Sequence, residues 1–330
     1  MKKALFPRLC ASVLACAAFG PVPQSTRADT WPATWPARTV HVVIPFSPGM
    51  GSPDAAARML ADGLGKRWKQ AVVVENRPGA DTMLATRAFL EMHDGHSLLF
   101  TTHSTFTVVP LLHTKVPYDP VGDVRPVSLA VEDFLAVVTA PALGVGALSD
   151  FVRLARQKPT SLNFYAVPGA PYLAYLAFQK RAGIETTFVA YNNPTNAIAD
   201  LSEGRIHIAV MPVASVLGAA QAGKIKILAV TNEQRTPAAP DIPTVKEAGY
   251  PEFTFGGFLG LFGPKDMPMA LREQIASDVR YILREPDVQE RLTTVGLIAR
   301  GTTPAEFERV MDAQRQRWSA VARDHKIEPQ

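Results

Sequence analysis

Short apolar runs rich in β-branched residues alternate along the chain with longer stretches whose apolar residues recur every three or four positions. The first run, Val40–Ile44, has the composition of a strand buried on both faces of a parallel sheet. A loop rich in Pro and Gly follows it, and Ser52-Pro53-Asp54 then supplies residues suited to a helix start. The apolar positions after residue 56 share one helical face, so the pattern predicts a strand, a tight loop and an amphipathic helix.

The same alternation continues to about residue 230 and predicts parallel sheets with right-handed crossovers. The expected strands are 40–44, 71–74 (buried), 97–101, 135–139, 162–167, 187–191, 206–211 and 225–230. The expected helices are 52–68, 83–90, 149–156, 172–182, 193–202 and 215–222, and after Pro264 only the helices 268–284, 286–295 and 303–326.

The loop at residues 46–54 directs backbone N–H groups from a helix N-terminus to one place, an arrangement that suits an anion. It is not a Walker A loop, because no Gly-Lys-Ser/Thr follows, and it lacks the GxGxxG spacing of dinucleotide sites. A tight turn that binds nothing is the alternative. A second polar loop, Thr102-His103-Ser104-Thr105, follows the strand expected at 97–101.

The N-terminus combines Lys2, Lys3 and Arg8 with an apolar run at 9–19 and small residues around Ala28. This pattern is typical of a secretory signal peptide, residues 1–28, rather than of a membrane span, so we expect a periplasmic protein. Lipoprotein processing at Cys16 is the alternative, since residues 13–16 loosely resemble a lipobox.

The charge balance changes when this leader is removed. The chain has 34 Lys and Arg and 30 Asp and Glu, and four of the cations, at positions 2, 3, 8 and 27, lie in the leader. The remaining 30 against 30 give a net charge of zero, so nucleic acid is not an expected partner. Cys10 and Cys16 also lie in the leader, so a chain cleaved after Ala28 has neither a disulfide nor a thiol nucleophile.

Candidates for catalysis are few. The histidines at positions 93, 96, 103 and 113 are close in sequence, but His93 and His96 span an Asp-Gly turn without a glutamate partner. We therefore expect surface-loop histidines rather than a metal site. A hydrolase nucleophile has no GxSxG motif to occupy.

Five segments, in order along the chain, carry a resemblance to a known family. They are VVIPFSPGMG (42–51), VVVENRPGA (72–80), VPYDPVGDVRPVSL (116–129), AGKIKILAVT (222–231) and PDIPTVKEAGYPEF (240–253). Together they resemble the Bug/TctC family, the extracytoplasmic solute receptors of tripartite tricarboxylate transporters.

The resemblance implies an α/β fold of the two-lobed type II periplasmic binding protein kind, with two mainly parallel sheets flanked by helices and two crossover strands. Lobe 1 is expected at 29–134 plus 259–330 and lobe 2 at 135–258, with the crossings near 134–136 and 258–260. A ligand carboxylate is expected in the cleft between the lobes, held by backbone amides, hydroxyls and waters. No cofactor and no catalytic residue is expected.

Several positions depart from the family pattern. The usual PGGxxD reads Pro48-Gly49-Met50-Gly51-Ser52-Pro53-Asp54, one residue longer, and the Gly-Gly-Asn after ENRPGA reads Asp81-Thr82-Met83. The polar second-lobe loop becomes the shorter, less polar segment 166–172. The usual acid falls on Met211, and the Trp before the second crossing is Phe258.

The expected ligand-binding residues are Phe46, Gly49, Met50, Gly51, Ser52, Asp54, Thr102, His103, Ser104, Thr105, Val167, Gly169, Tyr172, Tyr191 and Phe258. We expect the ligand carboxylate at the backbone of residues 49–52 and at the hydroxyls of Thr102, Ser104 or Thr105. An aromatic wall is expected from Phe106, Tyr165, Tyr172, Tyr191 and Phe258, although packing of the lobes against each other would explain the same rings.

Because Met211 cannot pair with an ammonium group and the second-lobe loop lacks donors, these departures favour a monocarboxylate with an apolar or aromatic body. A small dicarboxylate is the alternative. The expected function is a receptor that delivers its ligand to a permease of the tripartite tricarboxylate transporter type. A ligand sensor that partners a signalling protein is a second possibility, and a hydrolytic enzyme without identifiable catalytic residues is a third.

Overall fold

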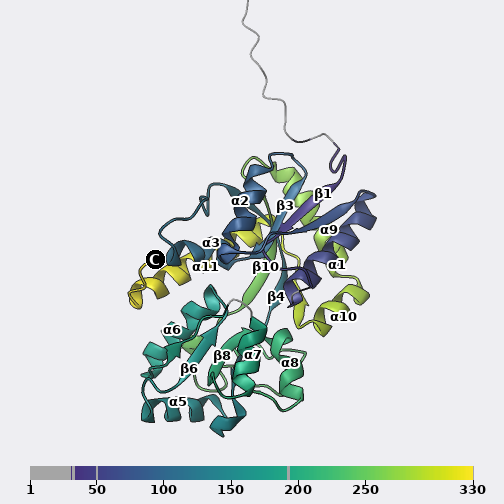
Figure 1. Ribbon diagram of the computed structural model, residues 1–330. Helices are drawn as coiled ribbons and strands as arrows, with labels where there is room; N and C mark the ends of the chain where they lie inside the picture. Colours follow the sequence, from purple (N-terminus) through teal and green to yellow (C-terminus); the bar gives the residue numbers. More distant parts are fainter. Residues whose placement is uncertain (1–30, 32–33, 50, 192–193, 330) are drawn as a thin grey trace, which may run out of the picture. The chain divides into compact units, whose positions relative to one another are not determined.

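The computed structural model describes residues 31, 34–49, 51–191 and 194–329 (Figure 1). The predicted leader at 1–28, including Cys16, lies outside these residues, as does the predicted site residue Met50. Within the described part of the chain, no helix is both long enough and apolar enough to cross a membrane.

Six strands form the first sheet, in the order β11-β4-β10-β3-β1-β2 (Figure 1). They are β1 (Val40–Ile44), β2 (Val72–Asn76), β3 (Ser97–Thr102), β4 (Val124–Asp133), β10 (Gly257–Pro264) and β11 (Leu297–Ala299). β1 pairs in parallel with β2 and β3, whereas β10 lies antiparallel between β3 and β4. Because parallel neighbours end at the same edge of a sheet, the loops after β1, β2 and β3 lie close together.

Helices cover both faces of this sheet. On one face are α1 (Gly51–Trp68), α9 (Met269–Leu283) and α10 (Pro286–Thr294). On the other are α2 (Met83–Glu91), the short α3 (Ser104–Thr107), which α4 (Val109–Leu112) follows, and the first half of α11 (Pro304–Asp324). The side chains of β1 alternate accordingly, with Val42 and Ile44 in one apolar cluster and Val43 in the other.

Five strands form the second sheet, in the order β7-β6-β8-β5-β9. They are β5 (Leu135–Thr139), β6 (Asn163–Ala166), β7 (Thr187–Phe188), β8 (Ile208–Pro212) and β9 (Lys226–Val230). β6 is parallel to β7 and β8, and β5 lies antiparallel between β8 and β9. One face carries α5 (Leu148–Gln157) and α6 (Ala170–Ala182), and the other carries α7 (Pro194–Ser202) and α8 (Val213–Gln221).

The predicted fold class is confirmed. Among the described strands most run in one direction within each sheet, and the reversed ones are β5, β10 and β11. Short 3₁₀ turns occur at Ala80–Thr82, Pro141–Leu143 and Pro251–Phe253.

Several local predictions were wrong. β4 begins with charged and proline residues and β10 contains three glycines, so neither produced a recognisable apolar run. The strand β11 lies after Pro264, where only helices were expected. β2 is a partly exposed edge strand rather than a buried one, because β1 is its partner and no second neighbour is found among the described residues. The residues 104 and 105 of the expected polar loop belong to α3.

The chain passes between the two sheets at Phe134, the single residue between β4 and β5, and again between β9 and β10. Asn232, just after β9, links the two passages. Its side-chain amide donates to the Asp133 carbonyl at 3.1 Å, and its Oδ1 accepts from the Leu135 N–H at 3.3 Å. A Cβ added at Gly256 would lie 3.4 Å from Asn232 Nδ2, which is an ordinary van der Waals distance.

Helix α11 contacts side chains that belong to both sheets. Phe307 packs in a cluster of the first sheet, whereas Trp318 packs in a cluster of the second. Near its end, Lys180 Nζ on α6 donates to the Asp324 carbonyl at 2.8 Å. The strands that make up each sheet agree with the two predicted lobes, which stay a prediction. In addition, the end of α11, which belongs to the predicted lobe 1, contacts the core of lobe 2.

The buried Asp133 at the first passage predicts a pH dependence of stability. Its side chain is 8% exposed, and its Oδ1 has no hydrogen-bond partner among the described residues. Burial raises the pKa of Asp133 to about 7, so the folded chain binds one more proton than the unfolded chain between about pH 4 and pH 7. The contribution of this group to stability therefore falls as the pH rises through that window, by on the order of 4 kcal/mol in total.

We expect Asp133→Asn to remove this fall and to be more stable than the wild type at pH 8, as measured by urea unfolding from pH 4 to pH 8. Glu132→Gln is the matched control, since Glu132 is the partly exposed neighbour paired with Arg300 at 2.6 Å. A wild-type slope retained in Asp133→Asn would contradict the assignment.

Candidate functional site

The loop between β1 and α1 is held in place by the Asp54 carboxylate. Asp54 is 2% exposed and accepts from Gly49 N at 2.9 Å, from Asn76 Nδ2 at 2.8 Å and from the Arg58 guanidinium at 2.9 and 3.1 Å. Burial acts to raise the pKa of Asp54, but the hydrogen bonds from Arg58, Asn76 and Gly49 outweigh it and hold this pKa below its ordinary value. Asp54 and the Gly49 N–H therefore build the loop, and their polar atoms are already engaged.

The remaining predicted residues of this loop have different surroundings. The carbonyl of Phe46 accepts from Asn76 at 2.8 Å, and its ring packs at the edge of the core. Gly51 begins α1 with a φ of 73°, in the left-handed region that favours glycine. Ser52 is 2% exposed, and its hydroxyl has no partner among the described residues. A buried hydroxyl without a partner is costly, which makes Ser52 a candidate ligand donor.

Two of the predicted residues after β3 are directed into the protein. Thr105 is fully buried, with its hydroxyl 2.7 Å from that of Thr101 and its carbonyl accepting from Tyr118 at 2.6 Å. His103 is 1% exposed and stacks on Phe258 with ring centroids 4.4 Å apart. Burial, assisted by the positive charge of Arg317, lowers the pKa of His103 to about 3, so the ring is neutral. Thr105, His103 and Phe258 are therefore engaged with neighbours inside the protein, and their contact with a ligand stays a prediction.

Thr102 and Ser104 remain at the edge of the sheet. Thr102 Oγ1 accepts from Ser104 N at 2.9 Å, which orders the start of α3. Ser104 Oγ accepts from Ala170 N at 3.3 Å, at the N-terminus of α6 in the second sheet. A Cβ at Gly169 would lie 3.2 Å from Ser104 Cβ, so a glycine permits this approach. Since a hydroxyl that accepts one bond can still donate another, Ser104 is a second candidate ligand donor.

A cavity of about 700 Å³ lies beside this contact. It is lined by Asp81, Leu112, His113, Tyr165, Pro168, Gly169, Tyr172, Leu176, Phe188, Ala190, Tyr191 and residues 326–329. The structure thus brings together Gly169, Tyr172 and Tyr191 of the predicted site, and Tyr165 of the predicted aromatic wall. Val167 instead packs against the apolar cluster of the second sheet, and its N–H donates to the Val210 carbonyl at 3.2 Å.

Four rings give the cavity an aromatic wall. Tyr172 contacts Phe188 with ring centroids 4.8 Å apart, and Tyr165 meets Tyr191 edge to face at 5.4 Å. The hydroxyl of Tyr191 donates to Asp200 at 2.5 Å. The hydroxyl of Tyr165 is buried and has no partner among the described residues, and burial raises the pKa of Tyr165 to about 12, so the phenol stays a neutral donor.

The loop between β2 and α2 contributes a strained segment to the same cavity. Ala80, Asp81 and Thr82 have φ values of 47°, 47° and 76°, and this conformation costs about 1–2 kcal/mol for each non-glycine residue. Asp81 Oδ2 accepts from His113 Nε2 at 2.8 Å. The departure at Asp81-Thr82-Met83 is visible in the sequence, but Asp81 and His113 were not predicted as cavity residues, because nothing local links two positions 32 residues apart.

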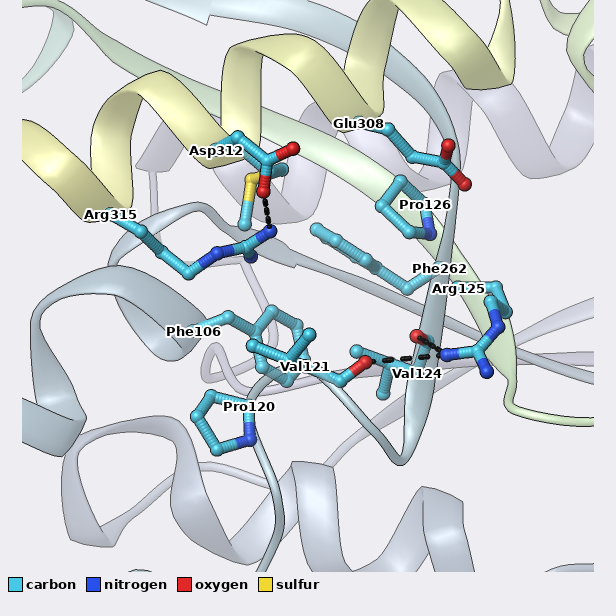
Figure 2. Close-up of a pocket in the computed structure, with 11 residues that line it drawn as sticks. Phe106, Pro120, Val121, Val124, Arg125, Pro126, Phe262, Glu308, Asp312 and Arg315 are labelled. Atoms are coloured by element: carbon cyan, nitrogen blue, oxygen red, sulfur yellow. Dashed lines mark hydrogen bonds and ion pairs between the residues drawn. The ribbon is translucent and has the colours of Figure 1, made fainter.

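A second concavity, of about 220 Å³, shares no lining residue with the first (Figure 2). Figure 2 shows Arg315 paired with Asp312, at 2.5 Å, and Arg125 directed to backbone carbonyls including that of Val124, at 2.9 Å. Phe106 lines this second concavity and not the first, so the structure does not bring it together with Tyr165, Tyr172 and Tyr191 of the predicted aromatic wall. The charged groups at this concavity are thus satisfied within the protein.

Two of the four histidines expected in surface loops, His96 and His103, are buried. His96 accepts from Ala37 N at 3.1 Å, and burial lowers its pKa. Among the described residues, no group of three or more His, Cys, Asp or Glu is arranged to hold a metal ion.

A family model described as the tripartite tricarboxylate transporter family receptor, TctC, matches residues 56–327. The chain belongs to this family. Protein BugT of Bordetella pertussis is 30% identical over 295 residues, which are 88% of this chain and 90% of BugT.

Solved structures of other proteins are also similar to this chain over most of its length. The receptor resembles Rpa4515 of R. palustris, solved with adipate, at 28% identity and a TM-score of 0.82, over 90% of this chain and 100% of that chain. It also resembles MatC of Rhodopseudomonas palustris, solved with bound malate, at 28% identity and a TM-score of 0.77, over 87% and 99% of the two chains. The family is a receptor family, and a further similar structure, at 27% identity and a TM-score of 0.81, is that of a periplasmic transporter, which confirms the class of protein predicted from the sequence.

The role of Asp54 predicts a loss of stability on neutralisation. Asp54→Asn removes the charge from the hydrogen bonds with Arg58 and gives Gly49 N a weaker acceptor, so we expect a loss of about 1.5–3 kcal/mol in the free energy of unfolding. Asp62→Asn, on an exposed turn of the same helix, removes only the pair with Lys66 and should cost below about 0.5 kcal/mol. Urea unfolding at pH 7 compares the two, and equal losses would contradict the structural role of Asp54.

Proposed function

We propose that this receptor captures a small carboxylate that has an apolar or aromatic body, in the cavity lined by Tyr165, Tyr172 and Tyr191. The observation that carries the proposal is the aromatic wall of this cavity together with the buried, unpartnered hydroxyl of Tyr165. A hydroxyl so placed is a ready donor to an anion, and the rings offer an apolar surface to the rest of the ligand. The adipate bound to Rpa4515 and the malate bound to MatC support a carboxylate ligand.

The carboxylate would be received at the loops that follow β1 and β3. These strands are parallel neighbours, so their loops meet at one edge of the sheet. Ser52, which follows the left-handed turn at Gly51, supplies a buried hydroxyl. Ser104 supplies the proton that its bond to Ala170 leaves unused, and this bond lies beside Gly169 of the cavity wall, although neither serine lines the cavity itself. Met211, where the sequence comparison expects an acid, is fully buried in the second sheet and offers no partner to a ligand ammonium.

The two predicted lobes, 29–134 plus 259–330 and 135–258, would close on the ligand about the passages at Phe134 and between β9 and β10. The contact of Ser104 with Ala170 supports this, because it joins a first-sheet loop to a second-sheet helix beside the cavity. We further propose delivery of the ligand to a membrane permease of the tripartite tricarboxylate transporter type, a partner that the family match supports.

A thermal-shift screen of monocarboxylates and dicarboxylates tests the proposal. A ligand present at a hundred times its Kd adds about 2.7 kcal/mol to the free energy of unfolding, so a true ligand should raise the Tm clearly. Tyr165→Phe should then weaken that ligand about tenfold by calorimetry, because one hydrogen bond to a charged group is lost.

Tyr281→Phe is the matched control, since Tyr281 is 56% exposed and does not line this cavity. If Tyr165→Phe and Tyr281→Phe bind the ligand with equal affinity, the Tyr165 hydroxyl is not part of the site. If no carboxylate raises the Tm of the wild type, the proposed function is wrong.

A further inference from the structure

The loop after β2 keeps side chains where the backbone conformation favours glycine. The backbone has positive φ at each residue from Gly79 to Thr82, and only Gly79 is a glycine. Glycines at 80–82 would adopt the same conformation without strain. A residue that is kept in a left-handed conformation at such a cost must contribute through its side chain, and for Asp81 that contribution is visible.

The Asp81 carboxylate is fixed on the wall of the 700 Å³ cavity. Its Oδ2 accepts from His113 Nε2 at 2.8 Å, and both residues line the cavity together with Gly169 and Tyr172 of the second sheet. The side chain of Asp81 is 39% exposed and that of His113 is 29% exposed, so the pair is partly shielded from solvent. Because a carboxylate has two oxygens, Oδ1 can accept from a ligand while Oδ2 accepts from His113.

The other charged residues that line the cavity are Lys326 and Glu328, which carry opposite charges two positions apart. The Tyr191 hydroxyl is already committed to Asp200. A ligand anion that extends toward Asp81 therefore meets a carboxylate, whereas a neutral hydroxyl or amide meets an acceptor. Two carboxylates in a partly shielded site repel each other, and a buried acceptor without a donor is unfavourable.

We infer that Asp81, oriented by His113, determines the charge of the accepted ligand: it excludes a second carboxylate and accepts a hydrogen bond from a neutral polar group at the ligand's far end. This inference rests on the proposed function, because it assigns the specificity of the same cavity.

Calorimetry with matched acid pairs tests the inference: butyrate against succinate, hexanoate against adipate, and benzoate against terephthalate. Among the three monocarboxylates, we expect the one that the wild type binds most tightly to bind at least tenfold more tightly than the dicarboxylate of the same pair. Asp81→Asn keeps the size of the side chain and removes its charge, so it should raise the affinity for the dicarboxylate about tenfold and leave the monocarboxylate within about twofold. Asp81→Gly, which also relieves the strained backbone, should shift the preference in the same direction and keeps the test valid if Asp81→Asn folds poorly.

Glu91→Gln is the control, because it removes one negative charge, as Asp81→Asn does. Glu91 lies at the end of α2, pairs with Arg87 at 2.8 Å and does not line the cavity. Glu91→Gln should leave both affinities unchanged. The inference is overturned if the wild type prefers the dicarboxylate of a pair. If Lys326→Met then abolishes that preference, Lys326 and not Asp81 determines the charge of the ligand, by pairing with its second carboxylate. The inference is also overturned if Asp81→Asn changes both affinities equally. Binding of no acid by any of these proteins would instead reject the proposed function, and this inference with it.

Discussion

The antiparallel strand β10 is the constraint on which the rest of the architecture depends. It returns from the second sheet and lies between β3 and β4, so it ties the N-terminal strands to the C-terminal helices. Gly260 has no side chain where Phe307 of α11 packs, and a Cβ there would overlap the ring. Two residues earlier, Phe258 stacks on His103. One strand therefore holds the loop after β3 and also seats the helix that reaches the core of the second sheet.

This arrangement decides which polar groups are used by the fold. The carboxylate of Asp54 accepts four hydrogen bonds, which fills its acceptor capacity, and Thr105 is bonded through both its hydroxyl and its carbonyl. The hydroxyls of Ser52 and Tyr165, in contrast, are buried and have no partner among the described residues. Buried polar residues thus divide into those whose polar atoms are engaged by the fold and those whose hydroxyls have no partner among the described residues, and burial alone does not separate the two groups.

The sequence predicted the elements whose signal is local. Val40–Ile44 and the helix after it follow from β-branched composition, helix-start residues and a period of 3.6, and all three act within a few positions. β10 has no such signal, because Gly260 is required by the close approach of Phe307, a contact that is distant in the sequence. The site shows the same limit. The loops at the ends of β1 and β3 were predicted from topology, but the inward orientation of Thr105 depends on Tyr118, and the pairing of Asp81 with His113 has no pattern in the sequence.

The two described cavities differ in whether the residues that line them are strained or lack hydrogen-bond partners. Around the second one, Arg315, Arg125 and Glu308 all have partners within the described chain. The first is lined by Asp81, which lies in a run of left-handed non-glycine residues, and by Tyr165, whose buried hydroxyl has no partner among the described residues. Strain and unsatisfied polar groups are physically independent costs, and selection for stability alone would remove both, by glycine in one case and by phenylalanine or valine in the other. Their coincidence at one aromatic cavity supports the proposal that the ligand binds there.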